Sequence, residues 1–230
     1  MKKVVVIEDE KTCFLCKSCL KEWATAILAH KKNYKVKKGE VIFKEGDPVT
    51  GIFFVNNGIV KVHKRWGADK ELILRFAKET EIFGHRALGG NGTYAISATA
   101  VKAGIVSYVD MSFFEATLKV NTEFMYNLLM FFAYDLRISE RKMRNLAHMP
   151  VKGRVAEALI MLKDQFGLTS EGFINIELSR QDLASFSGAT YETVFRVINE
   201  LTQEGLLTLS GKSITISNLA QLQKLTEDIA

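Results

Sequence analysis

Three cysteines near the N-terminus form the first group of residues with a recognisable chemistry. Cys13, Cys16 and Cys19 follow one another at intervals of three, and the chain contains no other cysteine. Thiolates at this spacing can converge on one metal ion or on an iron–sulfur cluster. Because a fourth cysteine is absent, a cluster would need a non-cysteine ligand or three-point attachment. A zinc ion would need a histidine, of which His30 is the nearest in sequence.

Four interpretations of this cysteine cluster stay open, and the cofactor is unknown. They are an iron–sulfur cluster, a zinc site, thiol–disulfide chemistry in either Cys-x-x-Cys pair, and reduced cysteines that pack as apolar side chains. We do not expect an enzyme, since no Ser-His-Asp arrangement or pair of carboxylates forms a motif. A thiol oxidoreductase is the enzymatic alternative, but the surroundings of Cys13 lack the βαβ setting that it would need.

A second group of residues, between positions 178 and 216, suits contacts with nucleic acid. Ser179 is a candidate N-cap for a short helix, and Gly188 supplies a tight turn after it. Thr190 caps a second helix, which Gly205 ends. Two short helices joined by a tight turn with glycine predict a helix-turn-helix motif. The segments 206–209 and 213–216 then predict a β-hairpin wing.

The second of these helices separates an apolar face from a polar one. A recognition helix presents its N-terminal end to base edges in the major groove. Arginine suits guanine O6 and N7, and glutamate accepts from cytosine N4. Glu192 and Arg196 are four residues apart, so an intrahelical ion pair is the alternative. The expected inward residues are Val194, Val197, Ile198 and Leu201, and the expected outward residues are Tyr191, Glu192, Phe195, Arg196 and Asn199.

Charge and composition restrict the class of protein. The 230 residues carry a net charge of +5, but the part from Val151 onward holds seven Lys/Arg and ten Asp/Glu residues. A nucleic-acid contact there must depend on particular residues and not on bulk charge. A hydrophobic content of 47% excludes a disordered chain. No run approaches the roughly 18 apolar residues of a membrane span, and Val4–Ile7 is too short for a secretory signal. We therefore expect a cytoplasmic protein without a membrane partner.

Residues 34–110 have the pattern of a β domain. Asn57-Gly58, between two apolar runs, predicts a hairpin with a type I′ turn. His63 alternates with Lys61 and Arg65, which predicts a solvent-facing side chain. Many short strands at regular spacing indicate a sandwich or barrel-like domain. The strand-like runs are Val41–Phe43, Ile52–Val55, Ile59–Val62, Leu72–Phe76, Ala95–Ala100 and Ile105–Val109.

The periodicity changes to helical after Ser112. The helix at about 120–147 has two apolar rows and therefore needs two partners, for which we expect the β domain and the same helix of a second subunit. A core helix within one domain is the alternative. We expect the helix to end near Pro150, a second helix over 151–167 and a strand over 173–178. The row assigned to the dimer interface is Met125, Leu129, Phe132, Leu136, Ser139, Met143 and Leu146, and the other row is Phe124, Leu128, Phe131 and Ile138.

Over about residues 34–220 the chain resembles the bacterial cyclic-AMP receptor protein/fumarate-nitrate reduction regulator (Crp/Fnr) family. The resemblance implies an α+β fold: a jelly-roll-like β-roll, a long dimerisation helix and a C-terminal winged helix-turn-helix. The implied divisions are an N-terminal segment 1–33 with the cysteine cluster, an effector domain 34–111, the dimerisation region 112–149 and a DNA-binding domain 150–230. The motifs that carry the resemblance are Lys38-Gly39-Glu40, Glu45-Gly46-Asp47, Gly58, Phe83-Gly84, Val151-Lys152-Gly153-Arg154, Ser179–Ala184 and Glu192–Ile198.

The resemblance also implies a homodimer that binds a palindromic DNA duplex with a TGA-like half-site core and, as an activator, contacts RNA polymerase. Glu192 and Arg196 occupy the family's base-reading positions, and Tyr191 leaves the outer part of the half-site open. The rival interpretation is a ligand- or metal-binding module whose winged helix contacts protein. The expected DNA-binding residues are Ser179, Arg180, Gln181, Thr190, Tyr191, Glu192, Arg196 and Lys212, of which Arg180, Gln181, Thr190 and Lys212 would approach phosphates.

The effector expected from the resemblance is not cyclic AMP. Relatives that bind it hold its ribose with a glutamate next to the Phe-Gly pair, where this chain has His85. They hold its phosphate with an arginine about ten residues later, where this chain has Tyr94-Ala95. Arg86 is expected on a strand, facing away from His85. The candidate pocket for another, unknown effector is Gly84, His85, Arg86, Tyr94, Ala95 and Ser139.

Overall fold

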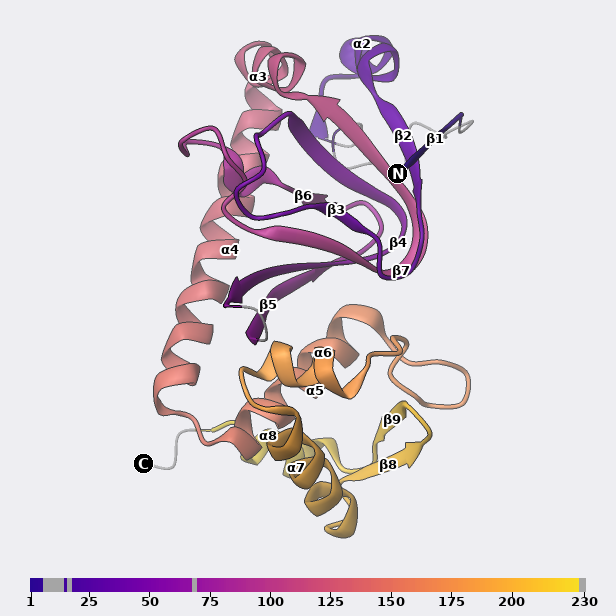
Figure 1. Cartoon of the computed structure of the whole chain (residues 1–230), viewed down its shortest axis with the longest axis vertical. Coiled ribbons are helices and arrows are strands. Elements are labelled where there is room, and N and C mark those ends of the chain that lie inside the picture. Colours follow the sequence, from indigo (N-terminus) through magenta and orange to yellow (C-terminus); the bar gives the residue numbers. More distant parts are fainter. Residues whose placement is uncertain (6–14, 16–17, 68–69, 228–230) are drawn as a thin grey trace. The chain divides into compact units, whose positions relative to one another are not determined.

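The computed structural model describes residues 1–5, 15, 18–67 and 70–227 of the chain. Two compact units divide it. The first unit comprises residues 1–66 and 74–137, and the second comprises 67–73 and 138–230 (Figure 1). None of the described helices is long and apolar enough to span a membrane.

A curved β-sheet dominates the first unit (Figure 1). Its strand order is β1-β2-β7-β4-β5, with β3 paired to β7 and β6 paired to β4. The long strands β4 and β7 are antiparallel and form the centre of this β-roll. The strands are β1 (Lys2–Val4), β2 (Lys32–Val36), β3 (Val41–Phe43), β4 (Gly51–Trp66), β5 (Lys70–Ala77), β6 (Ile82–Phe83) and β7 (Ser97–Asp110).

The hairpin predicted at Asn57-Gly58 is wrong, because β4 runs continuously through these residues. The pairing register between β4 and β7 shifts here, and Gly58 has a φ of 95°, so the turn-like residues form an irregularity within one strand. Asn57 accepts a hydrogen bond through Oδ1 from the backbone N–H of Ile105, at 3.0 Å. A Cβ added to Gly104 would lie 2.1 Å from the backbone oxygen of Asn57. The strand β7 thus pairs with β4 on both sides of Asn57-Gly58. The chain does not reverse direction at these two residues, as it would in a hairpin.

The solvent-facing position predicted for His63 is also wrong. Its side chain is buried, with Nε2 2.9 Å from Oγ1 of Thr99 on the neighbouring strand β7. This cross-strand contact gives the imidazole a polar partner in the sheet interior. Alternation along one strand could not predict it, because Thr99 is 36 residues away in sequence.

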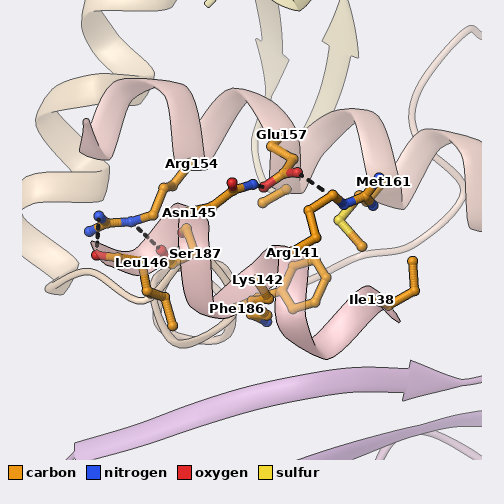
Figure 2. A pocket seen from close by; sticks show the side chains of 11 residues that line it. Ile138, Arg141, Lys142, Asn145, Leu146, Arg154, Glu157, Met161, Phe186 and Ser187 are labelled. Atoms are coloured by element: carbon orange, nitrogen blue, oxygen red, sulfur yellow. Dashed lines mark hydrogen bonds and ion pairs between the residues drawn. The ribbon is translucent and has the colours of Figure 1, made fainter. Parts of the chain in front are cut away.

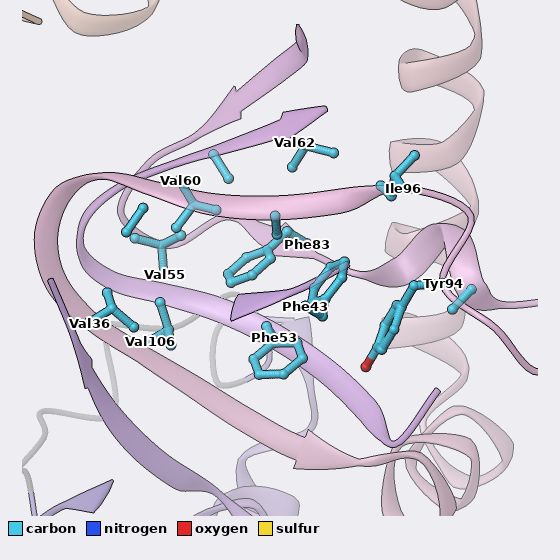
Figure 3. Close-up of a cluster of buried hydrophobic side chains, with 14 residues drawn as sticks. Val36, Phe43, Phe53, Val55, Val60, Val62, Phe83, Tyr94, Ile96 and Val106 are labelled. Carbon is cyan, nitrogen blue, oxygen red and sulfur yellow. The ribbon is translucent and has the colours of Figure 1, made fainter. Parts of the chain in front are cut away.

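An aromatic cluster fills the interior of the β-roll (Figure 3). The rings of Phe43 and Tyr94 stack at 4.0 Å between centroids, and Phe53 and Phe83 stack at 5.4 Å. Aliphatic side chains from β2, β4 and β7, and from Ile96 just before β7, complete this core. They include Val36, Val55, Val60, Val62, Ile96 and Val106.

The helices of the first unit pack on a second apolar cluster. Phe124 and Leu128 of the long helix α4 are buried in it, together with Phe113 and Phe114. Met125 and Leu129 on the other row of α4 are 51% and 63% exposed. The two rows therefore separate only in part. Leu136 and Met143 of the row assigned to the dimer interface are also exposed, but Phe132 of that row packs against this same cluster and Leu146 is half-buried within the second unit. The expected open position of Phe132 is wrong, because its ring contributes to the core of its own unit. The helical elements are η2 (Lys21–Trp23), α2 (Ala24–His30), η3 (His85–Ala87), α3 (Met111–Val120) and α4 (Thr122–His148), and α4 continues into the second unit.

The second unit contains a three-helix core and a two-stranded wing. Its α5 starts after Pro150 and ends at Gly167, as the sequence predicts. The strand predicted over 173–178 is absent there: this described segment makes an isolated bridge from Ile174 to Leu168 and no ladder. The elements are α5 (Val151–Phe166), α6 (Arg180–Ser187), α7 (Tyr191–Gln203), β8 (Leu207–Ser210), β9 (Ser213–Ile216) and α8 (Leu219–Lys224).

Candidate nucleic-acid interface

Two capped helices form the predicted helix-turn-helix. Ser179 begins α6, and its hydroxyl oxygen accepts from the backbone N–H of Asp182 at 2.9 Å. Thr190 begins α7 in the same way, accepting from the N–H of Thr193 at 3.3 Å. Gly188 ends α6 in the left-handed conformation, with a φ of 64°. The caps and the turn predicted from the sequence are confirmed, and each satisfies backbone groups that a helix end leaves unpaired.

The faces of α7 are separated as predicted. Tyr191, Glu192, Phe195 and Arg196 are exposed on the N-terminal half of the helix. The opposite face packs inward and fixes the orientation of the helix in the second unit. Its buried residues are Val194, Val197, Ile198 and Leu201.

Glu192 and Arg196 on the exposed face of α7 are not paired with each other. Arg196 lies with Nε 3.8 Å from Oε1 of Glu200, one turn toward the C-terminus. The intrahelical pair between Glu192 and Arg196, the alternative left open by the sequence, is not among the ion pairs of the described residues. Side chains of Arg196 and Glu200 are 73% and 44% exposed, so solvent screens their interaction. A carboxylate and a guanidinium are thus both available on this face.

The positions expected to approach phosphates surround the start of α6 and the wing. Arg180 donates from Nη2 to the carbonyl oxygen of Gly211 at 3.4 Å, which brings the first residue of α6 to the turn of the wing. Lys212 on that turn is exposed, and its Nζ lies 3.8 Å from Oε1 of Glu177. Gln181 is also exposed. The half-buried Arg180 and the exposed Lys212 thus lie close together at the wing turn, where cations suit contacts with a nucleic-acid backbone.

Arg154 connects several helix ends in the second unit (Figure 2). Its guanidinium donates to the carbonyl oxygens of Ser187 at 3.0 Å, Gly188 at 3.2 Å and Met149 at 2.9 Å. It thereby satisfies carbonyl groups at the end of α6 and beyond the end of α4. In the sequence, Arg154 was identified only as part of the motif Val151-Lys152-Gly153-Arg154. No feature of the sequence predicted its hydrogen bonds to these helix ends.

The polar groups of the neighbouring pocket in the same unit are largely paired among themselves (Figure 2). Asn145 donates to Oε2 of Glu157 at 2.8 Å, and Nε of Arg141 lies 3.7 Å from Oε1 of the same carboxylate. Lys142 donates to the carbonyl oxygen of Ile73 at 2.6 Å. The two contacts with Glu157 hold the C-terminal part of α4 against α5, and Lys142 joins α4 to β5.

The expected orientation of Arg86 in the first unit is wrong. Residues 85–87 form the 3-10 turn η3 and not a strand, because Gly84 enters the left-handed conformation with a φ of 81°. Both side chains therefore face Asp135 on α4. Arg86 donates from Nη2 to Oδ2 of Asp135 at 2.7 Å, and Nε2 of His85 lies 3.8 Å from that oxygen.

Burial and the neighbouring cations determine the protonation states of His85 and Asp135. His85 is 1% exposed, with Phe131 and Phe132 edge-on to its ring, and neither ring nitrogen forms a hydrogen bond with any residue that the structure describes. Burial lowers the pKa of His85 to about 4, so the imidazole is neutral at pH 7. For Asp135, burial alone would raise the pKa, but His85 and the guanidinium groups of Arg86 and Arg75 outweigh it and lower the pKa to about 2.

Sequence reasoning missed Asp135. It occupies the row of α4 that otherwise holds Phe124, Leu128, Phe131 and Ile138. An acidic residue in a buried apolar row is the signal that could have identified it, because a buried carboxylate needs a cation.

The remaining residues of the candidate effector pocket lie in different surroundings. Tyr94 is buried in the aromatic cluster, and its hydroxyl donates to the carbonyl oxygen of Gly51 at 2.6 Å. Ala95 is exposed, and Ser139 belongs to the second unit. The groups expected to replace the ribose-binding glutamate and the phosphate-binding arginine are thus a neutral imidazole and a phenol.

Of the cysteine cluster, Cys13 and Cys16 lie outside the described residues. Cys19 is a free thiol that packs against the apolar cluster of the first unit, and burial raises its pKa to about 12. His30 stacks on Phe113 at 4.1 Å. Among the described residues, no three His, Cys, Asp or Glu side chains are arranged to hold a metal ion. The four interpretations of the cluster therefore stay predictions.

Family models match both units. Residues 34–121 match the cyclic nucleotide-binding domain, and residues 153–225 match the Crp-like helix-turn-helix domain. The first match covers most of the β-roll and α3, and the second covers the helix-turn-helix with its wing.

Similar proteins match this chain over most of its length. The chain is 29% identical to the anaerobic regulatory protein of Bacillus subtilis (strain 168) over 185 residues, 78% of each chain. It is 26% identical to the cAMP-activated global transcriptional regulator CRP of Salmonella typhimurium over 85% of this chain and 92% of that one. The structure of FixK2 from Bradyrhizobium japonicum matches with a TM-score of 0.77 and 25% identity, over 87% of this chain and 99% of that one.

A β-roll of the cyclic nucleotide-binding type combined with a winged helix-turn-helix defines a class of DNA-binding transcriptional regulators. The relatives carry the names of such regulators and not of enzymes. This chain belongs to the Crp/Fnr family of transcriptional regulators.

Proposed function

We propose that the chain acts as a homodimer that binds a palindromic DNA duplex, with α7 of each subunit reading a TGA-like core in the major groove. The observation that carries this proposal is the exposed N-terminal half of α7, where Glu192 and Arg196 present a carboxylate and a guanidinium that are not paired to each other. Arginine hydrogen-bonds O6 and N7 of guanine, and glutamate accepts from N4 of cytosine. A TGA core offers a guanine on one strand and the paired cytosine on the other.

The second subunit would pack on the exposed row of α4. Leu129, Leu136 and Met143 on this row are 63%, 58% and 61% exposed, whereas Phe124 and Leu128 on the other row are buried. Large apolar side chains that repeat every seven residues on one helix face suit a left-handed helix pair. Such a dimer presents its two recognition helices to half-sites about 34–36 Å apart, one turn of the duplex.

Contacts with the DNA phosphates would come from a few individual side chains, because the C-terminal part of the chain is negatively charged overall. Arg180, Gln181, Thr190 and Lys212 are the groups that we assign to phosphates. Each phosphate neutralised by a cation releases counterions, so affinity should fall steeply with salt. The rival function, a winged helix that contacts protein, predicts no such dependence on DNA.

The effector domain would respond to a signal other than cyclic AMP. The relative from Salmonella typhimurium is named for activation by cAMP, but His85 and Tyr94 supply neither the carboxylate nor the guanidinium that a cyclic nucleotide needs. Another ligand of the β-roll, or metal or thiol chemistry at Cys13, Cys16 and Cys19, would supply the signal. It would act by changing the separation of the two recognition helices. As an activator, the dimer would also contact RNA polymerase.

Selection of duplexes from a random pool by the full-length chain tests this function. We expect enrichment of a palindrome with TGA-like half-sites, bound by two chains, with affinity unchanged by cAMP. Enrichment of no sequence, or of an asymmetric site bound by one chain, would contradict the proposal.

A further inference from the structure

Two aromatic side chains on α7 are left unused by the base and phosphate contacts proposed above. Tyr191 and Phe195 are 43% and 50% exposed. Their rings stack with centroids 6.3 Å apart and planes 13° from parallel. They lie on the exposed half of the helix that also carries Glu192 and Arg196.

The core of the second unit does not require these rings. The opposite face of α7 already contributes four buried aliphatic side chains, none more than 4% exposed. Single exposed apolar residues are ordinary on protein surfaces. A stacked pair is different, because each ring restricts the other and the two present a continuous apolar surface at a defined place.

The major groove offers one apolar group on the base edges, the 5-methyl group of thymine. The other groups on those edges are hydrogen-bond donors and acceptors, which a phenylalanine side chain can neither donate to nor accept from. Phe195 immediately precedes Arg196 in sequence and lies three residues after Glu192. Its ring would therefore reach a base pair close to those read by these two residues.

We propose that Phe195, with Tyr191 stacked against it, recognises the 5-methyl group of a thymine in each half-site. This inference rests on the proposed function, because it requires α7 to enter the major groove. It assigns specificity to a residue without hydrogen-bonding groups.

Replacement of thymine by deoxyuridine tests the proposal, because it removes the methyl group and leaves base pairing unchanged. The probe is the duplex selected by the full-length chain, with each thymine replaced singly and symmetrically in both half-sites. Burial of one methyl group corresponds to about a 4-fold change in affinity. We expect one symmetric replacement to weaken binding by roughly 10–20-fold and the others to have little effect.

The Phe195→Ala variant tests whether Phe195 causes the loss of affinity for the deoxyuridine duplex. It should bind the thymine duplex more weakly than the natural chain and show no response to deoxyuridine at the sensitive position. Because Phe195 is half exposed, the variant should fold, which circular dichroism can verify. Trp66→Ala is the matched control, since Trp66 is 82% exposed and lies on β4, far from α7 in sequence. It should keep the full response to deoxyuridine.

Each outcome decides the proposal. A deoxyuridine effect that disappears in Phe195→Ala supports it. A deoxyuridine effect that persists in Phe195→Ala overturns it and assigns the effect to another residue or to the duplex itself. Specific binding that depends on Glu192 and Arg196 but ignores deoxyuridine everywhere overturns it while the proposed function stands. If the chain selects no sequence at all, the proposed function fails and the inference fails with it.

Discussion

Arg196 pairs with Glu200 and not with Glu192: its Nε lies 3.8 Å from Oε1 of Glu200. This pair directs Arg196 away from the carboxylate that would otherwise neutralise it on the N-terminal half of α7. Exposed i,i+4 pairs contribute only about 0.3–0.5 kcal/mol, so DNA can displace Glu200 at small cost. Glu192 and Arg196 are therefore each free of the other and can contact different bases.

Removing either base-reading side chain should reduce discrimination between bases. We expect Glu192→Ala and Arg196→Ala each to lose about 1–3 kcal/mol of preference for the natural base pair over its variants at one position of each half-site. Fluorescence anisotropy with the selected duplex and its single-base-pair variants measures this. Glu200→Ala is the control and should change affinity by about 0.5 kcal/mol or less. Unchanged preference at every position in both variants would refute the assignment.

A charge on the exposed row of α4 should separate the subunits. Leu129→Glu places a carboxylate in the proposed interface, where it has no partner, and should weaken dimerisation at least 10-fold. Sedimentation velocity across micromolar concentrations measures the change. The adjacent Met130→Glu is the control, because Met130 is 50% exposed but lies off the row. Equal effects of the two substitutions, or a natural chain that is monomeric, would exclude this interface.

Lys212 should contribute affinity without specificity. Its Nζ lies on the wing turn, 3.8 Å from Glu177, and we assign it to a phosphate. We expect Lys212→Ala to weaken binding to selected and scrambled duplexes alike, and to reduce the magnitude of the salt slope by about 2, because each of the two subunits loses one phosphate contact. Lys163→Ala, on α5, should leave the slope unchanged. A Lys212→Ala variant that loses only sequence preference would indicate a base contact instead.

Acid should destabilise the first unit through His85. Burial lowers the folded-state pKa to about 4, below the ordinary value of 6.5. Between these values the unfolded chain takes up a proton and the folded chain does not, so stability is complete above about pH 6.5 and falls as the pH falls toward 4. The expected loss between pH 7 and pH 5 is about 2 kcal/mol. Asp135 adds nothing in this window, because its pKa is already about 2 in the folded state.

Urea unfolding followed by tryptophan fluorescence measures this loss, since both tryptophans, Trp23 and Trp66, belong to the first unit. His85→Gln should remove most of the pH dependence between pH 7 and 5. His148→Gln, at the exposed end of α4, should retain it. The same pH dependence in both variants would show that His85 titrates as in the unfolded chain.

Loss of Arg154 should destabilise the second unit. Arg154→Ala leaves the carbonyl groups of Met149, Ser187 and Gly188 without their donor, which should cost about 2–4 kcal/mol. Arg154→Lys should recover only part of this, because one ammonium group cannot span carbonyls that a planar guanidinium reaches together. Thermal unfolding by circular dichroism is the measurement. Full recovery by lysine would mean that charge alone, and not the geometry of the fork, matters.

The helix-turn-helix could be predicted because its signals are local. Ser179 and Thr190 cap the helices that directly follow them, and Gly188 and Gly205 adopt the positive φ that ends each helix. A cap needs only backbone groups within three residues, so the sequence contains the whole interaction.

The errors in the β-roll arise from pairing between distant segments. Asn57-Gly58 has the composition of a hairpin turn, but β7 pairs with β4 on both sides of it, about 45 residues further along the chain. Arg86 was misplaced for a related reason: Gly84 turns the chain, so residues after it do not alternate as in a strand. The pairing of Arg86 with Asp135 across 49 residues has no local signal at all.

The central claim is that a dimer of this chain recognises DNA through α7, and equilibrium binding at a series of salt concentrations tests it most directly. The two duplexes are a palindrome with TGA half-sites and a scrambled duplex of the same length and composition. We predict two chains per palindrome, an affinity at least about 1,000-fold above that for the scrambled duplex, and a log–log salt slope of about −4 or steeper. Equal affinity for the two duplexes, or a slope near zero, would contradict the claim and favour a protein partner for the winged helix.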